Sequence, residues 1–258
     1  MTKKDDGSFA RRTQGRMFEI GEKDEGGIYD MIPVDGDLLC ITRKNIHSIR
    51  LADSVDPHRT NPAIPDMQQK VLPYGSDTPF VGRTLLQAKV LFEDHCLVES
   101  VDCSKGILTA LSFLKEIVSL HESVTAYVTE EGQKNKSFEG KTAKDGSLHL
   151  PSLDRLEQRT KQFIINADHA SRHLMEIAQL FYPEIQNKNW CGQLRDKLAT
   201  DKNAASAGKD FAESMYKWIW LMRNLRNAVE HPKPNDQITV RDYRLMENGK
   251  VIPPTISY

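Results

Sequence analysis

The fold class of this chain is decided by residues 153–181, LDRLEQRTKQFIINADHASRHLMEIAQLF. Apolar or small residues recur in this stretch at alternating steps of three and four over four heptads. The series is Leu153, Leu156, Thr160, Phe163, Ala167, Ala170, Leu174, Ile177 and Phe181. Because an α-helix turns once every 3.6 residues, this spacing predicts one long helix that buries a narrow seam.

Other stretches with helical spacing lie on both sides of this one. Upstream, Ser104 is expected to cap a long helix that ends near Thr129 and repeats the same steps through Ile107, Ala110, Leu114, Ile117, His121, Val124 and Val128. Two such seams favour antiparallel packing in a bundle. Shorter helices are expected over residues 84–98 and around 190–198. A last helix is expected over residues 205–230, ended by Pro232 and Pro234.

The two ends of the chain have strand signals. Residues 38–41 and 46–51, joined by the polar turn Arg43-Lys44-Asn45, predict a β-hairpin. A second hairpin is predicted over residues 238–258, with its turn at Asn248-Gly249. We therefore expect a mainly α protein in four parts. These are a flexible N-terminal arm (1–26), a small β-hairpin and irregular region (27–82), a helical bundle (83–235) and a C-terminal β-hairpin (236–258).

Composition excludes several classes of protein. Lys and Arg total 35 against 36 Asp and Glu, so the net charge of -1 provides no global field for a polyanion, and any RNA site must be local. Lys115 and Glu116 interrupt the best candidate for a membrane span, which predicts no membrane association. The four cysteines have no C-x-x-C spacing and no export signal beside them, which predicts free thiols and a cytoplasmic protein.

The last helix has two distinct faces. One stripe is apolar and is predicted to face the core: Phe211, Met215, Trp218, Met222, Leu225 and Val229. A second stripe lies about 160° away at ~100° per residue and consists of Tyr216, Trp220, Arg223, Asn227 and His231. Aromatic rings beside an arginine, an amide and a histidine are typical of an interface or a binding site. The alternative is a central helix that is buried all round, with its polar side chains bonded to neighbouring backbone.

The end of this helix carries a family motif. Arg226-Asn227-Ala228-Val229-Glu230-His231 resembles the R-x4-6-H signature of the HEPN superfamily (higher eukaryotes and prokaryotes nucleotide-binding domains). The resemblance implies an antiparallel helical bundle and a homodimer. It also implies a metal-independent endoribonuclease site, with no cofactor, shared by two copies of the helix. By this resemblance His231 is the general acid and base, Arg226 stabilises the phosphate, and Asn227 has an orienting or hydrogen-bonding role. It further implies a toxin or phage-defence effector with an antitoxin or regulatory partner.

Physical chemistry supports these residue types. Cleavage by the RNA 2′-OH needs proton transfers near neutral pH and a cation beside the developing phosphate charge, which suit histidine and arginine. Arg226 projects about 140° from His231 on one helix, so it must reach round or meet a histidine of another chain. We infer that Arg223, Trp220 and Tyr216 contact the substrate.

Other readings of the same residues stay open. Arg226 and Glu230 have the i,i+4 spacing of an ordinary ion pair, and His231 has the position of a cation that favours a helix end. The stripe with Trp220 also suits a non-catalytic dimerisation or partner-binding module, or a nucleotide-binding sensor. We expect no metal site: His169 and His173 have ligand spacing, but no third ligand accompanies them.

Overall fold

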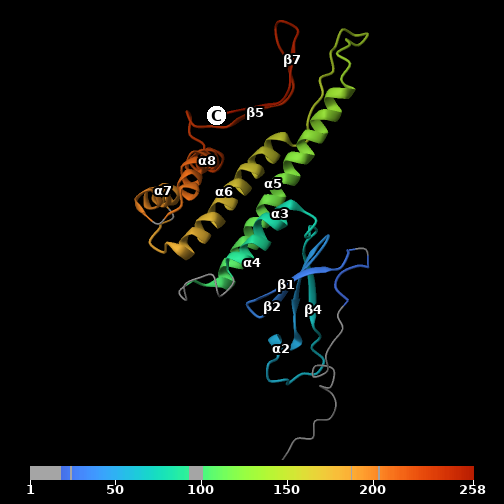
Figure 1. The fold of residues 1–258 in the computed structure, drawn as a ribbon. Helices are drawn as coiled ribbons and strands as arrows, with labels where there is room; N and C mark the ends of the chain where they lie inside the picture. Colours follow the sequence, from blue (N-terminus) through green and yellow to red (C-terminus); the bar gives the residue numbers. More distant parts are fainter. Residues whose placement is uncertain (1–18, 24, 93–100, 187, 203) are drawn as a thin grey trace, which may run out of the picture. The chain divides into compact units, whose positions relative to one another are not determined.

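The computed structural model describes residues 19–23, 25–92, 101–186, 188–202 and 204–258. About half of the chain is helical, with a small antiparallel sheet and a C-terminal hairpin, which confirms the mainly α prediction (Figure 1). The chain divides into two compact units, Met1–Leu114 and Lys115–Tyr258. None of the described helices has both the length and the apolar character needed to cross a membrane.

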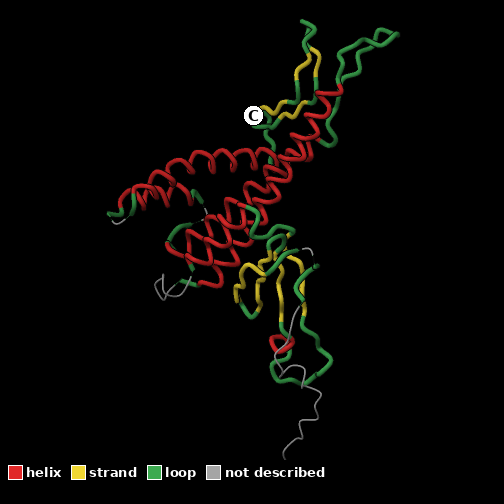
Figure 2. Tube along the Cα trace, turned by 45° about the vertical axis from the view of Figure 1, so that its right-hand side comes forward, coloured by secondary structure: helices red, strands yellow, loops and turns green. Residues whose placement is uncertain are grey.

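The first unit contains a four-stranded antiparallel sheet (Figure 2). Its strands follow one another in the order β1 (Ile28–Val34), β2 (Asp37–Thr42), β3 (Ile46–Arg50) and β4 (Met67–Leu72). The predicted hairpin forms the central pair, β2 and β3. The sequence did not predict the two outer strands. β1 contains Pro33, and three residues of β4, Gln68, Gln69 and Lys70, are polar and exposed, so neither strand shows a clear apolar alternation.

Short helices complete the first unit: α2 (Ala52–Val55), α3 (Pro79–Val81), the π-helix η1 (Gly82–Leu86) and α4 (Gln87–Leu91). The continuous run from α3 to α4 starts earlier than the helix predicted over residues 84–98, and the end of that prediction lies outside the described residues. The Lys89 ammonium lies 2.6 Å from an oxygen of Asp30 and ties α4 to β1.

The predicted flexible arm ends in a buried contact. Residues 1–18 and 24 lie outside the described residues, but the Glu25 carboxylate is buried 2.6 Å from Nε2 of His47, with the Lys70 ammonium 3.3 Å away. Burial alone raises the pKa of Glu25. Hydrogen bonds from His47, the backbone of Glu22 and the Asn45 side chain outweigh burial and, with the charge of His47, lower the pKa to about 2. Glu25, near the C-terminal end of the predicted arm, is therefore fixed to the sheet.

Helix α5 (Cys103–Ser137) continues from the first unit into the second. The backbone N–H of Lys105 donates to the side chain of Asp102 at 2.9 Å, so Asp102 caps the helix in place of the predicted Ser104. The helix also ends later than predicted. A glycine such as Gly132 costs only ~1 kcal/mol inside a helix, and lysines near the C-terminus favour its dipole.

Helix α6 (Leu156–Phe181) runs antiparallel to the second-unit part of α5, as the two seams predict. The amide of Asn166 donates to Ser119 at 2.9 Å, and Arg159, one turn from the start of α6, pairs with Glu130 near the end of α5. The predicted seam does not include all the buried residues of α6, because Asn166, Asp168 and Ser171 are buried as well. Asn166 is buried against α5, whereas Asp168 and Ser171 are buried because α8 covers a second side of α6.

Helices α7 (Trp190–Thr200) and α8 (Ser206–Glu230) confirm the two remaining predicted helices. An apolar cluster joins α6, α7 and α8 and consists of Met175, Ile185, Trp190, Cys191 and Ile219. The free thiol of Cys191 is buried in it, and burial raises its pKa to about 11 although the Arg195 charge lowers it, so the thiol is neutral near pH 7. Among the described residues Cys40 and Cys103 are also free, as predicted.

The predicted C-terminal hairpin is confirmed as two short ladders in series (Figures 1 and 2). The inner ladder pairs β6 (Arg244–Leu245) with β7 (Val251–Ile252), and the outer pairs β5 (Thr239–Arg241) with β8 (Thr255–Ser257). Gly249 adopts the positive φ of +78° that the turn requires. The Tyr243 hydroxyl donates to the Asn135 side chain at 2.7 Å, which holds the base of the hairpin on α5.

Candidate functional site

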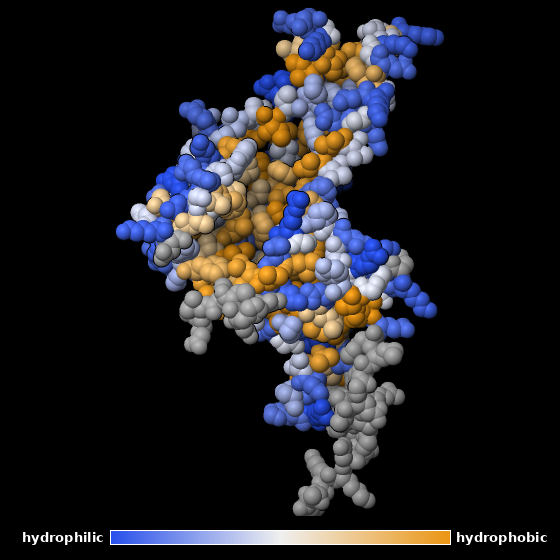
Figure 3. Space-filling view, in the orientation of Figure 1, coloured by the Kyte–Doolittle hydropathy of each residue, from blue (hydrophilic) through white to orange (hydrophobic). Residues whose placement is uncertain are grey.

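The inner face of α8 is not the one that its apolar stripe predicts. Its buried residues are Ala212, Ile219 and Ala228, whereas Phe211 is 58% and Trp218 63% exposed. The prediction that this stripe faces the core is therefore wrong. The face with Ile219 turns inward because Met175 of α6 and Trp190 of α7 provide its apolar contacts. Figure 3 shows apolar side chains gathered in a hollow over α6 and α8.

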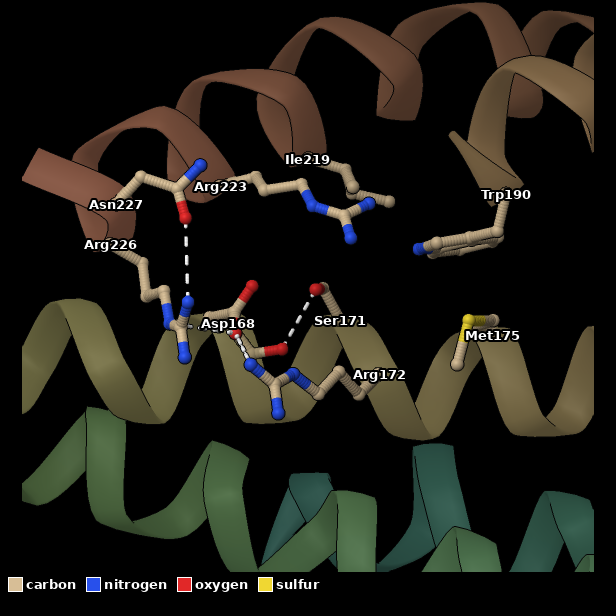
Figure 4. A pocket seen from close by; sticks show the side chains of 9 residues that line it. All are labelled: Asp168, Ser171, Arg172, Met175, Trp190, Ile219, Arg223, Arg226 and Asn227. Carbon is tan, nitrogen blue, oxygen red and sulfur yellow. Dashed lines mark hydrogen bonds and ion pairs between the residues drawn. The ribbon is translucent and has the colours of Figure 1, made fainter. Parts of the chain in front are cut away.

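A cavity of about 330 Å³ lies between α6 and α8 and is closed at one end by α7 (Figure 4). Three arginines from two helices line it: Arg172 from α6, and Arg223 and Arg226 from α8. The other lining residues are Asp168, Ser171, Met175, Trp190, Ile219 and Asn227. Figure 4 shows the Arg223 guanidinium extending into the middle of the cavity, with the indole nitrogen of Trp190 pointing in from the far end. The lining is therefore rich in hydrogen-bond donors and positive charge.

The only acidic side chain in this lining is Asp168, which holds two of the arginines. Its carboxylate is 7% exposed, and its Oδ2 atom lies 2.6 Å from Nη2 of Arg172 and 3.8 Å from Nε of Arg226. Arg226 also pairs with Glu230 one turn further along α8, and its Nη1 donates to the Asn227 amide oxygen at 3.4 Å. A single buried carboxylate thus orients guanidinium groups from both helices.

A second cavity, of about 460 Å³, adjoins the first and shares Trp190, Ile219 and Arg223 with it. Its lining adds two aromatic rings of α8, Tyr216 and Trp220, together with Lys188, Asn189, Cys191 and Asn224. Trp220 is 59% exposed. The Arg195 guanidinium lies 4.4 Å from the centre of the half-buried Tyr216 ring. The second cavity is therefore more aromatic than the first, and one arginine, Arg223, belongs to both.

The structure brings most of the predicted site residues together, with one exception. Arg223, Arg226 and Asn227 line the first cavity, and Tyr216, Trp220 and Arg223 line the second. His231 lines neither: it is the exposed C-cap of α8, and its backbone N–H donates to the Asn227 carbonyl at 2.8 Å. The i,i+4 ion pair of Arg226 with Glu230, which the sequence left open, is present.

Several lining residues were not found from the sequence. Asp168, Ser171, Arg172 and Trp190 come from two helices that precede the motif. The i,i+4 spacing of Asp168 and Arg172 could have indicated an ion pair, but such pairs are common on solvated helix faces and do not by themselves indicate a site. The two histidines with ligand spacing pair with different carboxylates, Glu116 for His169 at 3.7 Å and Glu176 for His173 at 3.2 Å. Within the described ranges, no group of three or more metal-ligating side chains was found.

We compared the chain with known proteins. No family model matches it, and neither does any curated protein or solved structure. The geometry of the two cavities therefore carries the functional argument.

Proposed function

We propose that this chain is a homodimeric, metal-independent endoribonuclease of the HEPN type, with a site completed by a second copy of the chain. The observation that carries the proposal is the convergence of Arg172, Arg223 and Arg226 on one cavity, one helical turn from the exposed His231. Although the net charge of the chain is -1, three guanidinium groups lie together where the motif begins, at Arg226 and Asn227. Planar guanidinium groups match phosphate oxygens in pairs.

The proposed reaction is cleavage of RNA by its own 2′-OH. One neutral imidazole of His231 takes the proton of the 2′-OH as the O2′–P bond forms. The P–O5′ bond breaks, and the leaving 5′ oxygen takes a proton from a protonated His231 imidazole of the second copy. The products are a 2′,3′-cyclic phosphate and a 5′-OH. Arg226 and Arg223 offset the negative charge that builds on the phosphate oxygens.

A second copy is needed because Arg226 and His231 diverge within one chain. The Arg226 guanidinium is directed toward Asp168 of α6, while His231 lies exposed at the end of α8. Trp220, which is 59% exposed, shares its face of α8 with Asn227 and His231, and a second copy of α8 can cover this face.

The test is cleavage of single-stranded RNA in EDTA by the full chain. We expect His231→Ala to abolish cleavage and Arg226→Lys to reduce it, with His149→Ala as a matched exposed-histidine control that leaves it unchanged. Undiminished cleavage by the His231→Ala variant would refute the assignment. A strictly monomeric mass of the active protein, measured by light scattering, would refute the shared site.

A second candidate is a non-catalytic module that binds a partner protein. The exposure of Phe211 and Trp218 on one face of α8 favours it, because large apolar side chains exposed in a group mark interaction surfaces. In that case no variant cleaves RNA, and Trp218→Glu weakens self-association or partner binding. A role as a toxin or phage-defence effector, restrained by an antitoxin or regulatory protein, belongs to the first candidate.

A further inference from the structure

An apolar pocket lies where the C-terminal hairpin meets the two long helices of the second unit. Its volume is about 160 Å³, and its walls come from α5, α6 and β8. The apolar side chains of the lining are Val124, Tyr127, Leu156, Phe163 and Ile256. None of its lining residues belongs to either of the cavities beside α8, so the pocket is a separate candidate site.

The two aliphatic hydroxyl groups of the lining donate within their own helices. The Ser123 hydroxyl donates to the Ser119 carbonyl at 2.8 Å, and the Thr160 hydroxyl donates to the Leu156 carbonyl at 2.9 Å. Each bond runs back by one helical turn, which is a common arrangement for such side chains inside a helix. Their hydrogens are therefore already used and are not offered to a ligand in the pocket.

The other two polar side chains of the lining are held by carboxylates outside it. Arg159 pairs with Glu130, and its Nη1 donates to the Asp154 carbonyl at 3.2 Å. Burial, the charge of Glu131 and a hydrogen bond with Glu131 raise the pKa of Tyr127, so its hydroxyl is neutral near pH 7. A polar ligand would therefore give up its bonds with water and find few replacements in this pocket.

We propose that this pocket binds a small, uncharged ligand built on a single aromatic ring. An apolar cavity of about 150 Å³ accepts benzene, so a volume of about 160 Å³ suits one ring. Drug-sized ligands occupy roughly 300–1,000 Å³ and are too large. A ring is favoured over an open chain because Tyr127 and Phe163 present aromatic rings from α5 and α6, and aromatic rings gain from edge-to-face or offset contact. The proposal does not depend on ribonuclease activity.

A bound ring would also hold the hairpin against the helices. Ile256 of β8 is 58% exposed and Val124 of α5 is 46% exposed, so part of each side chain still faces water beside the pocket. A ligand between them removes apolar surface from water on both segments at once. Binding therefore stabilises the folded chain, since the contacts exist only when α5, α6 and β8 are together.

The test is titration of the full chain with toluene, phenol and benzoate, followed by ligand-detected nuclear magnetic resonance. We expect toluene to bind at least about tenfold more tightly than phenol, because the phenol hydroxyl loses its bonds with water without replacement. Benzoate should not bind at millimolar concentration, since its carboxylate would be unpaired in an apolar pocket. Absence of toluene binding would overturn the proposal, as would binding of phenol or benzoate as tightly as toluene.

A matched pair of variants on α5 locates the ligand. Val124→Phe places a ring at the pocket and is expected to weaken toluene binding at least about tenfold, because the new side chain occupies the same space. Val128→Phe is the control, because Val128 lies one turn further along α5, is 58% exposed and does not line the pocket. This control should bind toluene as the unchanged chain does. Equal loss in the two variants would overturn the proposal.

A second pair of variants tests the wall formed by the hairpin. Ile256→Ala is expected to weaken toluene binding by about threefold to tenfold, because it removes carbon atoms that the ring would cover. Leu245→Ala is the control, since Leu245 is 50% exposed on the same hairpin but lies outside the lining. Unchanged affinity in Ile256→Ala would overturn the contact with the hairpin. Dissociation of a dimer by toluene, seen by light scattering, would assign the pocket to a second copy and overturn the small-molecule site.

Discussion

The replacement Arg226→Ala tests the electrostatic core of the site. Arg226 lies 3.8 Å from the buried Asp168 carboxylate, and its side chain is only partly exposed. At an effective dielectric constant of 20, two charges at that distance attract by about 4 kcal/mol before the cost of removing them from water is counted. Desolvation of the guanidinium offsets roughly half of this attraction, and the Glu230 pair adds less than about 1 kcal/mol because it is nearer the surface. We therefore expect Arg226→Ala to lower the free energy of unfolding by about 2–3 kcal/mol.

A double-mutant cycle assigns this loss to the ion pair. Asp168→Ala removes the buried charge together with its desolvation cost, and the half-exposed Arg172 then turns to water. We expect it to cost about 1 kcal/mol alone and to make the Arg226→Ala change nearly neutral in the double variant. The coupling energy should be about 2 kcal/mol, measured by urea unfolding followed by far-ultraviolet circular dichroism. Arg241→Gln serves as the surface control, within about 0.5 kcal/mol of the unchanged chain. Additive effects, with a coupling below about 0.5 kcal/mol, would refute the reasoning.

Four further outcomes are expected. His231→Ala should abolish RNA cleavage yet change the free energy of unfolding by less than about 0.5 kcal/mol, because its side chain is exposed; unfolding of this variant would contradict the placement. Trp220→Glu should give a monomer by light scattering, with cleavage lowered at least about tenfold; an active dimer would argue against the α8 contact. Because the pKa of Glu25 is lowered to about 2 in the folded chain, its ionised form stabilises the fold fully above pH ~4.5, and this stabilisation is lost as the pH falls toward 2. The difference in unfolding free energy between the chain and Glu25→Gln should therefore shrink across that window in urea titrations, and a constant difference would contradict the lowered pKa of Glu25. Gly249→Ala should cost about 1 kcal/mol in thermal unfolding because its φ is +78°, and a neutral change would mean that the turn relaxes.

The local signals of the chain predicted local structure well. The three-four spacing predicted α6, and the neighbouring seam predicted the antiparallel course of α5 that the Ser119–Asn166 hydrogen bond and the Glu130–Arg159 pair confirm. Asn248-Gly249 predicted the turn of the C-terminal hairpin. These features depend on residues close in sequence, whose geometry is set by backbone preferences.

The orientation of α8 could not be predicted in the same way. Periodicity shows which residues share a face, but the partner of each face is set by other elements. Phe211 and Trp218 have the right spacing for a core and are exposed, whereas Ile219 is buried because it meets Met175 and Trp190. Asp168, Ser171 and Arg172 of α6 line the cavity, but they are polar and do not belong to the apolar pattern of the helix. The sequence therefore predicted only the part of the site that lies on α8.

The sequence by itself determined the long helices, the two hairpins and the Arg226–His231 motif, because each follows from spacing, capping and turn residues within one segment. Only the tertiary structure decided that Asp168 and Arg172 of α6 and Trp190 of α7 join Arg223 and Arg226 around adjoining cavities. The physical reason is that a cavity and its electrostatic balance depend on distances between helices. Such distances are set by packing and are not encoded in the periodicity of any single segment.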